Sequence, residues 1–511
     1  MDTPSVEEAM SGNEAAKWTA AMKQEVEAIH KHEMWEEMAA PPGARIVETK
    51  WVLKKKRNEN GSVVRYKARL KARGCTEVPG LEIREAFAPV AQTATIRILL
   101  AQTLQNNLVA RHYDIENAYF HVPIEDEVYI KAPVAVNVKG GNLLRLRKSI
   151  YGLEQATRRW GEVLATALAK RGLKRSYIDP ALFINKDKTE FLAVHDDDLL
   201  HVSNRESDFG KWLASTFTVK DLGRPTYLLS MELNWKRDSL QLSQTAYLEH
   251  IIDKFLPRGN GTASVPMSSD ERPGRRKNAD PAANLRKYQA AVGSLLYAAL
   301  VTRPDIMFSV CCLSQFVSNP AEDHMRLVEN VFRYLAGTKN LMITYHRDDR
   351  NHASTPLLAY SDASLANSLW NRKGFSGYTA FYHGCPVAWK TTKQPLAAFS
   401  ATEVGYISLA DAVSSTTSLH FLLGEISVDN KYARPKIYSD IGLRILAKNP
   451  PLGCQFRSKH LGVRYYFTRE AHERKKIELK FVFDGKQNPA YLLTNAVEGD
   501  HFSCLLPQFL S

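Results

Sequence analysis

Residues Phe191–Ser203 have the sequence Phe-Leu-Ala-Val-His-Asp-Asp-Asp-Leu-Leu-His-Val-Ser. Two apolar runs, 191–194 and 199–202, flank three consecutive aspartates, which predicts a β-hairpin with its charges gathered at the turn. Neighbouring carboxylates repel one another, and a fixed cluster of them suits Mg²⁺, which prefers hard oxygen ligands. A solvated acidic turn is the alternative, because a short motif is only a hypothesis.

The bulk composition is that of a globular protein. A length of 511 residues corresponds to roughly three or four domains, and 44% apolar with 24% charged residues is ordinary for a folded chain. No segment approaches the ~20 apolar residues of a membrane span, and the first residues have no signal-peptide pattern. Six scattered cysteines without a CxxC pair predict reduced thiols, an intracellular location and no structural zinc site.

The positive charge is concentrated in two stretches. The net charge is +13, and Lys50–Arg73 holds ten Lys or Arg residues with a single acid, Glu59. A second basic stretch runs through 145–159. Clustered cations suit a polyphosphate partner, bound with release of counterions. Solvated basic faces are the alternative interpretation.

Helical and strand patterns alternate along the chain, which indicates a mixed α+β architecture. Around the hairpin, the periodicity of apolar residues predicts helices over 15–32, 95–108 and 156–171, and strands over 45–53, 62–70 and 109–115. The segment 258–286 is rich in Gly, Pro, Ser, Asn and Asp and is the best linker candidate. Beyond it we expect a helical region over 288–337, strands over 357–360, 377–389 and 435–439, and a helix over 401–423.

Asp114 ends the predicted strand 109–115 and is a further acidic candidate. With Asp197 and Asp198 it would supply three carboxylates from two strands meeting at one edge of a sheet. Such a set can hold two metal ions about 3.5–4 Å apart, the arrangement used in phosphoryl transfer. The sequence pattern alone does not show that Asp114 lies near Asp197.

The missing connection comes from a family resemblance. From about Trp18 onward the chain resembles the reverse transcriptase and ribonuclease H segments of a copia-type LTR retrotransposon Pol polyprotein. The resemblance rests on phrases that occur in order over most of the chain, namely Lys50-Trp-Val52, Arg65-Tyr-Lys-Ala-Arg-Leu70, Glu85-Ala-Phe-Ala-Pro-Val-Ala91, Asp114-Ile-Glu-Asn-Ala-Tyr-Phe120, Ser149-Ile-Tyr-Gly-Leu-Glu-Gln-Ala156, Lys220-Asp-Leu-Gly223, Val292-Gly-Ser-Leu-Leu-Tyr297, Thr302-Arg-Pro-Asp305 and Arg333-Tyr-Leu-Ala-Gly-Thr338.

The resemblance implies an α+β multidomain fold, in which a fingers-palm-thumb reverse transcriptase is followed by a connection region and an RNase H-like α/β domain. It implies that Asp114, Asp197 and Asp198 hold two Mg²⁺ ions, with Mn²⁺ as a substitute. The expected divisions are an N-terminal helical lead-in (1–40), the fingers, palm and start of the thumb (41–257), a linker (258–286), a helical thumb or connection region (287–350), an RNase H-like domain (355–496) and a C-terminal tail (497–511).

Three further residues match positions that the resemblance assigns to nucleotide binding. Lys67 and Arg69 on the fingers hairpin are expected to contact the triphosphate, a task suited to a point-charge Lys and a planar Arg. Their alternative is a contact with the template backbone, or plain surface charge. Gln155 is expected beside the nucleotide sugar and template, and a helix-capping or buried hydrogen-bonding Gln is its alternative.

A second set of carboxylates belongs to the C-terminal part. Asp362 and Asp440 each follow a predicted strand, and Glu403 opens a predicted helix. The resemblance to ribonuclease H implies that they hold two Mg²⁺ ions against the RNA strand of a hybrid. For Glu403 the alternative is structural, because Ser400-Ala-Thr-Glu403 is also a capping box. His460 lies in a phrase that matches the family, and a surface histidine is equally compatible with it.

The chain also departs from the family pattern. His195 and Asp196 stand where the pattern has Tyr and Val, and we expect Asp196 to turn toward solvent or to raise a neighbour's pKa. Glu154 reverses a charge near the template path. Tyr491 replaces the fourth carboxylate of the nuclease site, and a neutral phenol is no substitute for an anionic ligand. Ile441 stands where Asn is common.

The resemblance therefore predicts an RNA-directed DNA polymerase with an attached RNase H-like domain. Its partners would be an RNA template, a DNA primer, the RNA/DNA hybrid and deoxynucleoside triphosphates, with other retrotransposon proteins as further candidates and no membrane. Its place would be intracellular, in a cytoplasmic virus-like particle or the nucleus. The chain is expected to be a 3′ portion of Pol. The alternatives are a catalytically weak remnant that binds nucleic acid, and a polymerase whose RNase H-like domain only holds the hybrid.

Overall fold

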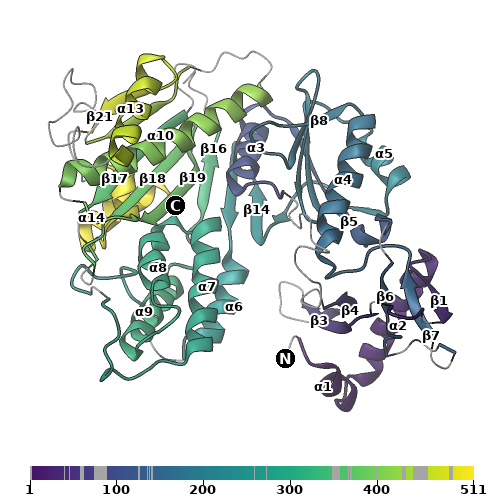
Figure 1. Ribbon diagram of the computed structural model, residues 1–511. Helices are drawn as coiled ribbons and strands as arrows, with labels where there is room; N and C mark the ends of the chain where they lie inside the picture. Colours follow the sequence, from purple (N-terminus) through teal and green to yellow (C-terminus); the bar gives the residue numbers. More distant parts are fainter. Residues whose placement is uncertain are drawn as a thin grey trace.

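In the computed structural model (Figure 1), helices and strands are mixed along the whole chain and form two lobes that lie side by side. The structure describes residues 3–39, 41–44, 46–57, 63–73, 89–124, 127–134, 136, 138–139, 142–257, 259, 261–271, 273–347, 357–365, 367–368, 371–398, 400–427, 433–440, 459–482 and 487–511. For residues 56, 57, 154, 155 and 459–461 it describes the backbone only.

The N-terminal part surrounds a two-stranded ribbon. Strands β3 (Thr49–Arg57) and β4 (Val63–Ala72) form the antiparallel hairpin expected from the sequence. Helix α2 (Ala15–Lys31) buries Trp18, Met22 and Ile29 and packs on β4. After the short helix α1 (Val6–Ser11) and α2, the segment expected as a helical lead-in ends in a strand, β1 (Trp35–Ala39). That strand belongs to a four-stranded sheet with β2 (Ile46–Val47), β6 (Tyr129–Ile130) and β7 (Asn142–Leu146).

A six-stranded sheet in the order β12-β5-β11-β10-β9-β8 carries the aspartate hairpin. The hairpin runs from β10 (Glu190–His195) to β11 (Asp198–Ser203), so the expected strands extend by one residue or so at each end. Helix α3 (Thr93–Gln105) is buried almost throughout, and α4 (Glu154–Lys170) contributes Trp160 and Leu164 to a second apolar cluster. The other strands are β5 (Val109–Ile115), β8 (Leu173–Arg175), β9 (Leu182–Asn185) and β12 (Val219–Asp221).

A helical region with a small sheet follows. Helices α7 (Leu285–Val301), α8 (Met307–Ser314) and α9 (Glu322–Thr338) agree with the helical region expected over 288–337. The segment predicted as a linker, 258–286, has neither helix nor strand in its described residues up to Asn284, apart from a single bridge between Ala282 and Ala321, and its last two residues already belong to α7. A short helix α5 (Phe209–Thr216), helix α6 (Thr245–Phe255) and a sheet of β13 (Tyr227–Leu228), β14 (Met231–Trp235), β15 (Ser239–Ser243) and β16 (Ile343–His346) complete the middle of the chain.

The C-terminal part is a five-stranded mixed sheet in the order β19-β18-β17-β20-β21, with the long helix α10 (Ala401–Ile426) packed on it. Strands β17, β20 and β21 run parallel. Helix α13 (Lys459–Glu473) packs on α10. The strands are β17 (Leu357–Ser364), β18 (Phe375–Tyr382), β19 (Cys385–Lys393), β20 (Lys436–Ser439) and β21 (Glu478–Phe481).

The segment 497–511, expected as a tail, is folded onto the rest of the molecule. Helix α14 (Gly499–Leu505) buries Phe502 and Leu505, and Ser511 exchanges two backbone hydrogen bonds with Met342 of 2.9 and 3.2 Å. Burial of these apolar side chains stabilises the end of the chain against fraying. Among the described residues, no helix is both long and apolar enough to cross a bilayer.

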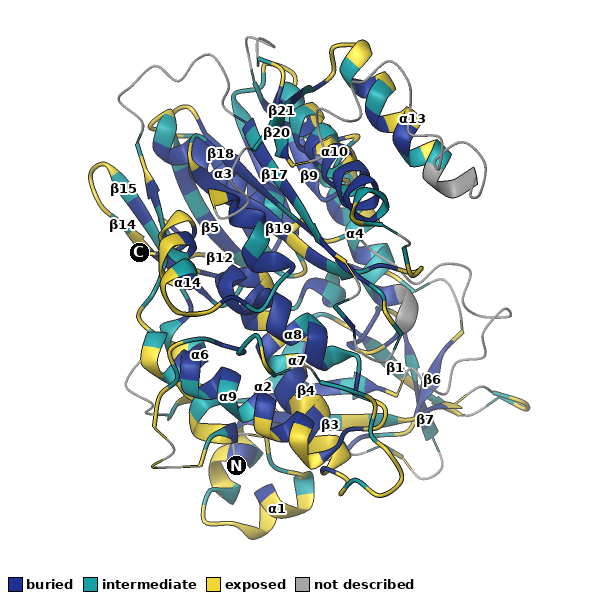
Figure 2. Ribbon diagram, turned by 90° about the vertical axis from the view of Figure 1, so that its left-hand side faces the viewer, coloured by how far each residue is buried: buried dark blue, intermediate teal, exposed yellow. Residues whose placement is uncertain are grey.

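One apolar core joins the hairpin sheet, the helical region and the C-terminal sheet. Figure 2 shows the buried residues continuing from the C-terminal strands through α3, α8 and α7. At the centre of this junction, Arg97 of α3 is 3% exposed and donates hydrogen bonds to the carbonyls of Val387, Leu300 and Val301. Its guanidinium lies 3.7 Å from the ring centroid of Trp389. These contacts hold the two sheets together, and an α+β multidomain fold is confirmed.

Candidate functional site

The turn of the β10–β11 hairpin presents the first acidic cluster. His195 pairs with Asp198 across the hairpin, so Asp196 and Asp197 form a two-residue turn. Asp196 has a φ of 54° and is exposed. Asp tolerates this left-handed conformation because its short side chain can hydrogen-bond locally. The extra charge therefore lies on the turn and faces solvent, and it also helps to raise the pKa of Asp197, so both outcomes expected for Asp196 are observed.

Asp114 lies beside this turn because β5 pairs antiparallel with β11. The register places Asp114 directly opposite Asp198, and the Ile115 N–H donates a 2.9 Å hydrogen bond to the Asp197 carbonyl. The structure thus brings together the three acids that the sequence pattern could not place. They lie at one end of two adjacent inner strands of the six-stranded sheet, where β5 ends and β11 begins.

The three acids influence one another electrostatically. The pKa of Asp197 is raised to about 6, mainly because the carboxyl is buried, and the charges of Asp114 and Asp196 add to this rise. The pKa of Asp114 is also raised, first by burial and then by the charge of Asp198. Arg69 and Lys67 oppose these shifts. A neighbouring cation therefore favours the ionised form of these carboxyls.

Cations from the β3–β4 hairpin lie close to the acids. Arg69 on β4 lies with its Nη2 3.7 Å from Oδ2 of Asp197, and its guanidinium lies 4.3 Å from the ring centroid of Tyr151. Lys67 is two residues away on the same strand, so both side chains face the same side of the ribbon. The structure brings Lys67 and Arg69 close enough to act on the charges of Asp114 and Asp197. The side chain of Gln155 lies outside the described residues.

Two neighbours of the cluster had not been singled out in the sequence. Nε2 of His112 lies 2.9 Å from Oδ1 of Asp198, and the His112 side chain is 8% exposed. Its only sequence signal is its position two residues before Asp114, which puts both on one face of β5. Tyr119 is half-buried, and its pKa is raised mainly by burial and further by Asp197 and Asp196. Both residues help to surround the acids.

The donor chemistry of this cluster fits Mg²⁺, although the side chains of Asp197 and Asp198 are turned toward Arg69 and His112. Within the part of the chain that the structure describes, no three His, Cys, Asp or Glu side chains converge closely enough to form a metal-binding group. Asp197 faces Arg69 and Asp198 faces His112, which separates like charges in the way that electrostatics favours. The three carboxylates are hard oxygen ligands of the kind that divalent cations prefer. The pKa values of two of them, Asp197 and Asp114, are raised.

The second acidic cluster lies on the C-terminal sheet. Parallel pairing of Tyr360 with Tyr438 places Asp362 and Asp440, each two residues farther on, at the same end of neighbouring strands. Burial raises the pKa of Asp362 to about 6; the Thr494 hydroxyl lowers it, and the charge of Asp440 raises it. Asp440 itself is exposed. The structure thus brings Asp362 and Asp440 together.

Glu403 stands in the first turn of α10, which packs on β17. Its backbone N–H donates a 3.2 Å hydrogen bond to Oγ of Ser400. The Ser400 half of the capping box offered as an alternative for this motif is therefore formed. Ile441 lies outside the described residues, as does the His460 side chain.

Three neutral side chains, those of Thr494, Asn495 and Tyr491, lie near Asp362. The Thr494 hydroxyl donates a hydrogen bond to Oδ2 of Asp362, and Nδ2 of Asn495 lies 3.4 Å from the same oxygen. Tyr491, in the 3-10 turn η5 (Pro489–Leu493), has a pKa raised by burial and by the charge of Asp362. A phenol thus stands near Asp362 where the family pattern has a carboxylate.

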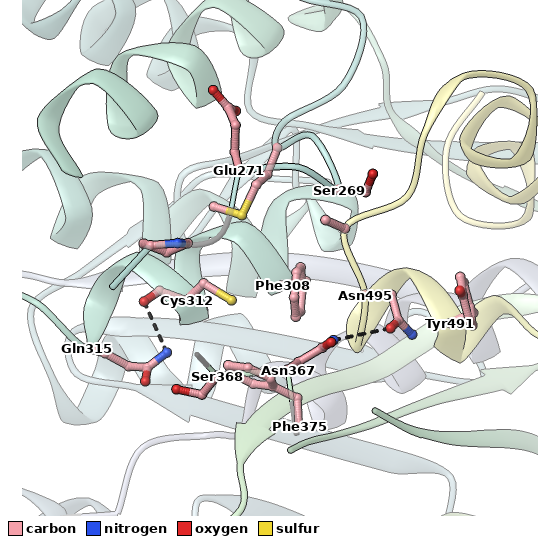
Figure 3. Close-up of a pocket in the computed structure, with 13 residues that line it drawn as sticks. Ser269, Glu271, Phe308, Cys312, Gln315, Asn367, Ser368, Phe375, Tyr491 and Asn495 are labelled. Atoms are coloured by element: carbon pink, nitrogen blue, oxygen red, sulfur yellow. Dashed lines mark hydrogen bonds between the residues drawn. The ribbon is translucent and has the colours of Figure 1, made fainter. Parts of the chain in front are cut away.

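A cavity of about 210 Å³ lies next to this second cluster, between the linker, α8 and η5. Figure 3 shows Tyr491 and Asn495 on one side of it and Phe308 and Cys312 on another. Nδ2 of Asn367 lies 3.3 Å from Oδ1 of Asn495. None of the six acids assigned from the sequence lines this cavity, so the clusters themselves remain the candidate sites.

Comparison with known proteins gives a consistent picture. Residues 32–269 match the family described as reverse transcriptase (RNA-dependent DNA polymerase). The chain is 30% identical over 515 residues to a retrovirus-related Pol polyprotein from transposon TNT 1-94 of Nicotiana tabacum, an alignment that covers 98% of this chain and 38% of the relative. It is 33% identical over 470 residues to the Pol polyprotein from transposon RE1 of Arabidopsis thaliana, covering 89% and 31%. The chain spans about a third of the length of these relatives.

Among solved structures, one similar fold is a foamy viral protease-reverse transcriptase in complex with dsDNA. The superposition has a TM-score of 0.49 at 13% sequence identity and covers 92% of this chain and 83% of the other.

Proposed function

Because this chain belongs to the reverse transcriptase family through residues 32–269 and is related over nearly its whole length to transposon Pol polyproteins, we propose that it is an RNA-directed DNA polymerase. It extends a primer on an RNA or DNA template by two-metal nucleotidyl transfer. Its substrates are deoxynucleoside triphosphates. The observation that carries the proposal is the register of β5 and β11, which sets Asp114 opposite Asp198 beside Asp197.

Asp114, Asp197 and Asp198 are the residues that would hold Mg²⁺, with Mn²⁺ as a substitute. The bound ions would supply activation of the primer 3′-hydroxyl and neutralisation of the triphosphate charge. The chain's own contribution is to keep three carboxylates at one sheet edge. Burial of Asp197 and Asp114, together with their mutual repulsion, gives the cluster its preference for added positive charge.

Lys67 and Arg69 are proposed to bind the phosphates of the incoming nucleotide. Both extend from β4 toward the acids, and Arg69 is oriented by its stack on Tyr151. A stacked guanidinium keeps its N–H donors in one plane, which suits the paired oxygens of a phosphate. Gln155, on the first turn of α4, is proposed to lie by the nucleotide sugar and template.

The C-terminal domain is proposed to bind the RNA/DNA hybrid, with Asp362, Glu403 and Asp440 as the groups that would hold Mg²⁺ for RNA cleavage. A second candidate role, holding the hybrid without cutting it, is favoured by one observation. Asp362 is surrounded by the neutral groups of Thr494, Asn495 and Tyr491, and the pattern's fourth carboxylate is replaced. We place the enzyme in a cytoplasmic particle or the nucleus, with other retrotransposon proteins as partners.

Primer extension on an RNA template, with cleavage of the hybrid RNA measured in the same reactions, tests both roles. Mg²⁺-dependent extension together with cleavage supports two active sites, and extension without cleavage supports the holding role. A folded chain that binds hybrid in a salt-sensitive way yet extends no primer would refute the polymerase proposal. Removal of divalent cations with a chelator should stop extension and leave binding through the basic hairpin.

A further inference from the structure

A groove far from both acidic clusters joins the hairpin sheet to the C-terminal domain. It encloses about 1070 Å³ between the β8–β9 edge of the sheet and the last turns of α10. Figure 1 shows the C-terminal end of α10 lying next to β8. The two walls are connected directly: Nζ of Lys188 donates hydrogen bonds of 2.8 and 3.0 Å to the carbonyls of Gly424 and Ser427.

The groove is separate from the sites described above. Along α10, Phe421 is eighteen residues from Glu403, or about 27 Å at the helical rise. In the hairpin sheet, β10 runs from Glu190 at the end nearer the groove to His195 at the acidic turn, about 17 Å away. The groove therefore adds a surface that neither acidic cluster uses.

Basic side chains outnumber acidic ones in the lining of the groove. Four cations, Lys174, Arg175, Lys186 and Lys188, face a single acid, Glu425. That acid is already engaged, because it accepts hydrogen bonds from the Ser176 hydroxyl and from the Tyr177 N–H at 3.0 Å. Lys174 and Lys186 are exposed, so their charge is available at the opening. Asp187 is exposed beside Lys186 but does not line the groove.

Two aromatic side chains stand out at the same opening. Tyr177, between β8 and β9, is 96% exposed, and Phe421 on α10 is 48% exposed. Large aromatic side chains usually bury most of their surface, and their exposure together at a hollow marks a binding site. They come from opposite walls, so a chain lying in the groove passes between them.

We propose that this groove binds single-stranded nucleic acid, with bases stacked on Tyr177 and Phe421 and phosphates near Lys174 and Lys186. A positively charged groove with aromatic platforms is the general solution for strands without sequence preference. Unpaired bases are required, since the bases of a duplex are already stacked on one another. The inference does not rest on polymerase activity, because neither acidic cluster contributes to it.

The test uses the full chain in the presence of saturating blunt hairpin duplex, which would occupy the proposed polymerase site. Binding of fluorescent oligo-dT and oligo-rU is then measured over a series of salt concentrations. We expect added binding of the single strands, and a loss of about tenfold or more in Tyr177→Ala/Phe421→Ala, because each stacked base contributes appreciably. Lys174→Gln/Lys186→Gln should reduce the slope of log affinity against log salt by about 1.4, or about 0.7 for each single-strand phosphate that a lysine no longer neutralises.

Matched controls are Tyr227→Ala, an aromatic 52% exposed on β13, and Lys236→Gln, an exposed lysine after β14. Both should bind as the unchanged chain does. Photo-crosslinking of a 4-thiouridine oligonucleotide should label the peptide that contains Tyr177. Equal binding by all variants, labelling confined to the fingers, or equally good competition by a duplex of the same length would overturn the proposal. The lysine pair is exposed, so its variant keeps the fold even where the aromatic double variant does not.

Primer extension by the same variants separates this inference from the proposed polymerase. Variants of the groove should extend a short primer–template at the unchanged rate, since the palm acids are intact. A chain that extends no primer yet loses single-strand binding in Tyr177→Ala/Phe421→Ala would refute the polymerase proposal and support the groove.

Discussion

The two acidic clusters share a plan but differ in what surrounds them. In the hairpin sheet, Asp197 faces the cation of Arg69 at 3.7 Å, and Lys67 acts on the same acids. In the C-terminal sheet, Asp362 accepts hydrogen bonds from the neutral Thr494 and lies by the neutral Asn495. Both carboxyls nevertheless have a pKa raised to about 6 by burial.

The two clusters therefore differ in the charge of the groups that surround their buried acids. The first cluster has cationic groups beside it on a separate strand, which under the proposed function would bind the phosphates of the nucleotide. The second cluster has its most buried acid held by donors from its own domain. Such donors fix a carboxylate in place without supplying charge for a substrate. We therefore expect substitutions to disable chemistry at the first site far more than at the second.

The largest expected effect is in Asp197→Asn. Replacing a charged ligand by a neutral amide should lower primer extension on the order of 10³-fold, at the upper end of the cost of losing one electrostatic stabiliser. Rates of single-nucleotide addition measure it. Asp362→Asn should leave extension within about twofold, and Asp196→Asn, at the exposed turn, serves as the adjacent control. Equal losses in Asp197→Asn and Asp362→Asn would break the comparison.

A smaller effect is expected in Arg69→Gln. Without a charge-assisted hydrogen bond to the triphosphate, kcat/KM for the nucleotide should fall roughly 10- to 100-fold. Steady-state kinetics with a varied nucleotide concentration measure it. Arg73→Gln, which removes an exposed arginine paired with Glu48 at 3.0 Å, should change little. If both arginines matter equally, Arg69 acts through general charge and its position beside Asp197 is incidental.

The pH dependence of extension should report the raised pKa of Asp197, about 6. The ionised carboxylate is the form that would bind Mg²⁺, so at sub-saturating Mg²⁺ activity is retained above this pKa and falls about tenfold per pH unit below it. Asp196→Asn removes a negative charge that raises the pKa, and the acid limb should move to lower pH. Arg69→Gln removes a positive charge that lowers it, and the limb should move to higher pH. Two identical profiles would show that another group controls the acid limb.

The smallest effect is expected in Tyr491→Asp. A carboxylate beside Asp362 restores the anionic group that the family pattern has there, and hybrid cleavage in Mg²⁺ should rise a few-fold. Tyr491→Phe keeps the aromatic ring, removes only the hydroxyl and adds no charge, so it should leave cleavage unchanged. Labelled RNA in a preformed hybrid gives the readout. A large gain would mean that the second cluster lacks only this one ligand.

Local patterns predicted most of the elements. The hairpin 191–203 appears as β10 and β11 with small extensions, because apolar runs around a polar turn specify a hairpin within a few residues. The helix predicted over 15–32 is observed as Ala15–Lys31 for the same reason. The strand β1 after it was not anticipated, since its partner β7 lies more than a hundred residues away. Nor was the packing of 497–511, which depends on apolar surface from distant elements.

The sequence by itself determined the family, the two sets of acids and the basic hairpin that accompanies one of them. Each of these depends on residue identity at short spacing. Only the tertiary structure decided that Asp114 stands opposite Asp198, that His112 contacts Asp198, and that Arg97 joins the sheets. Asp114 and Asp198 are more than eighty residues apart. A contact between distant strands depends on register and on the burial of a shared core, and neither leaves a local pattern in the chain.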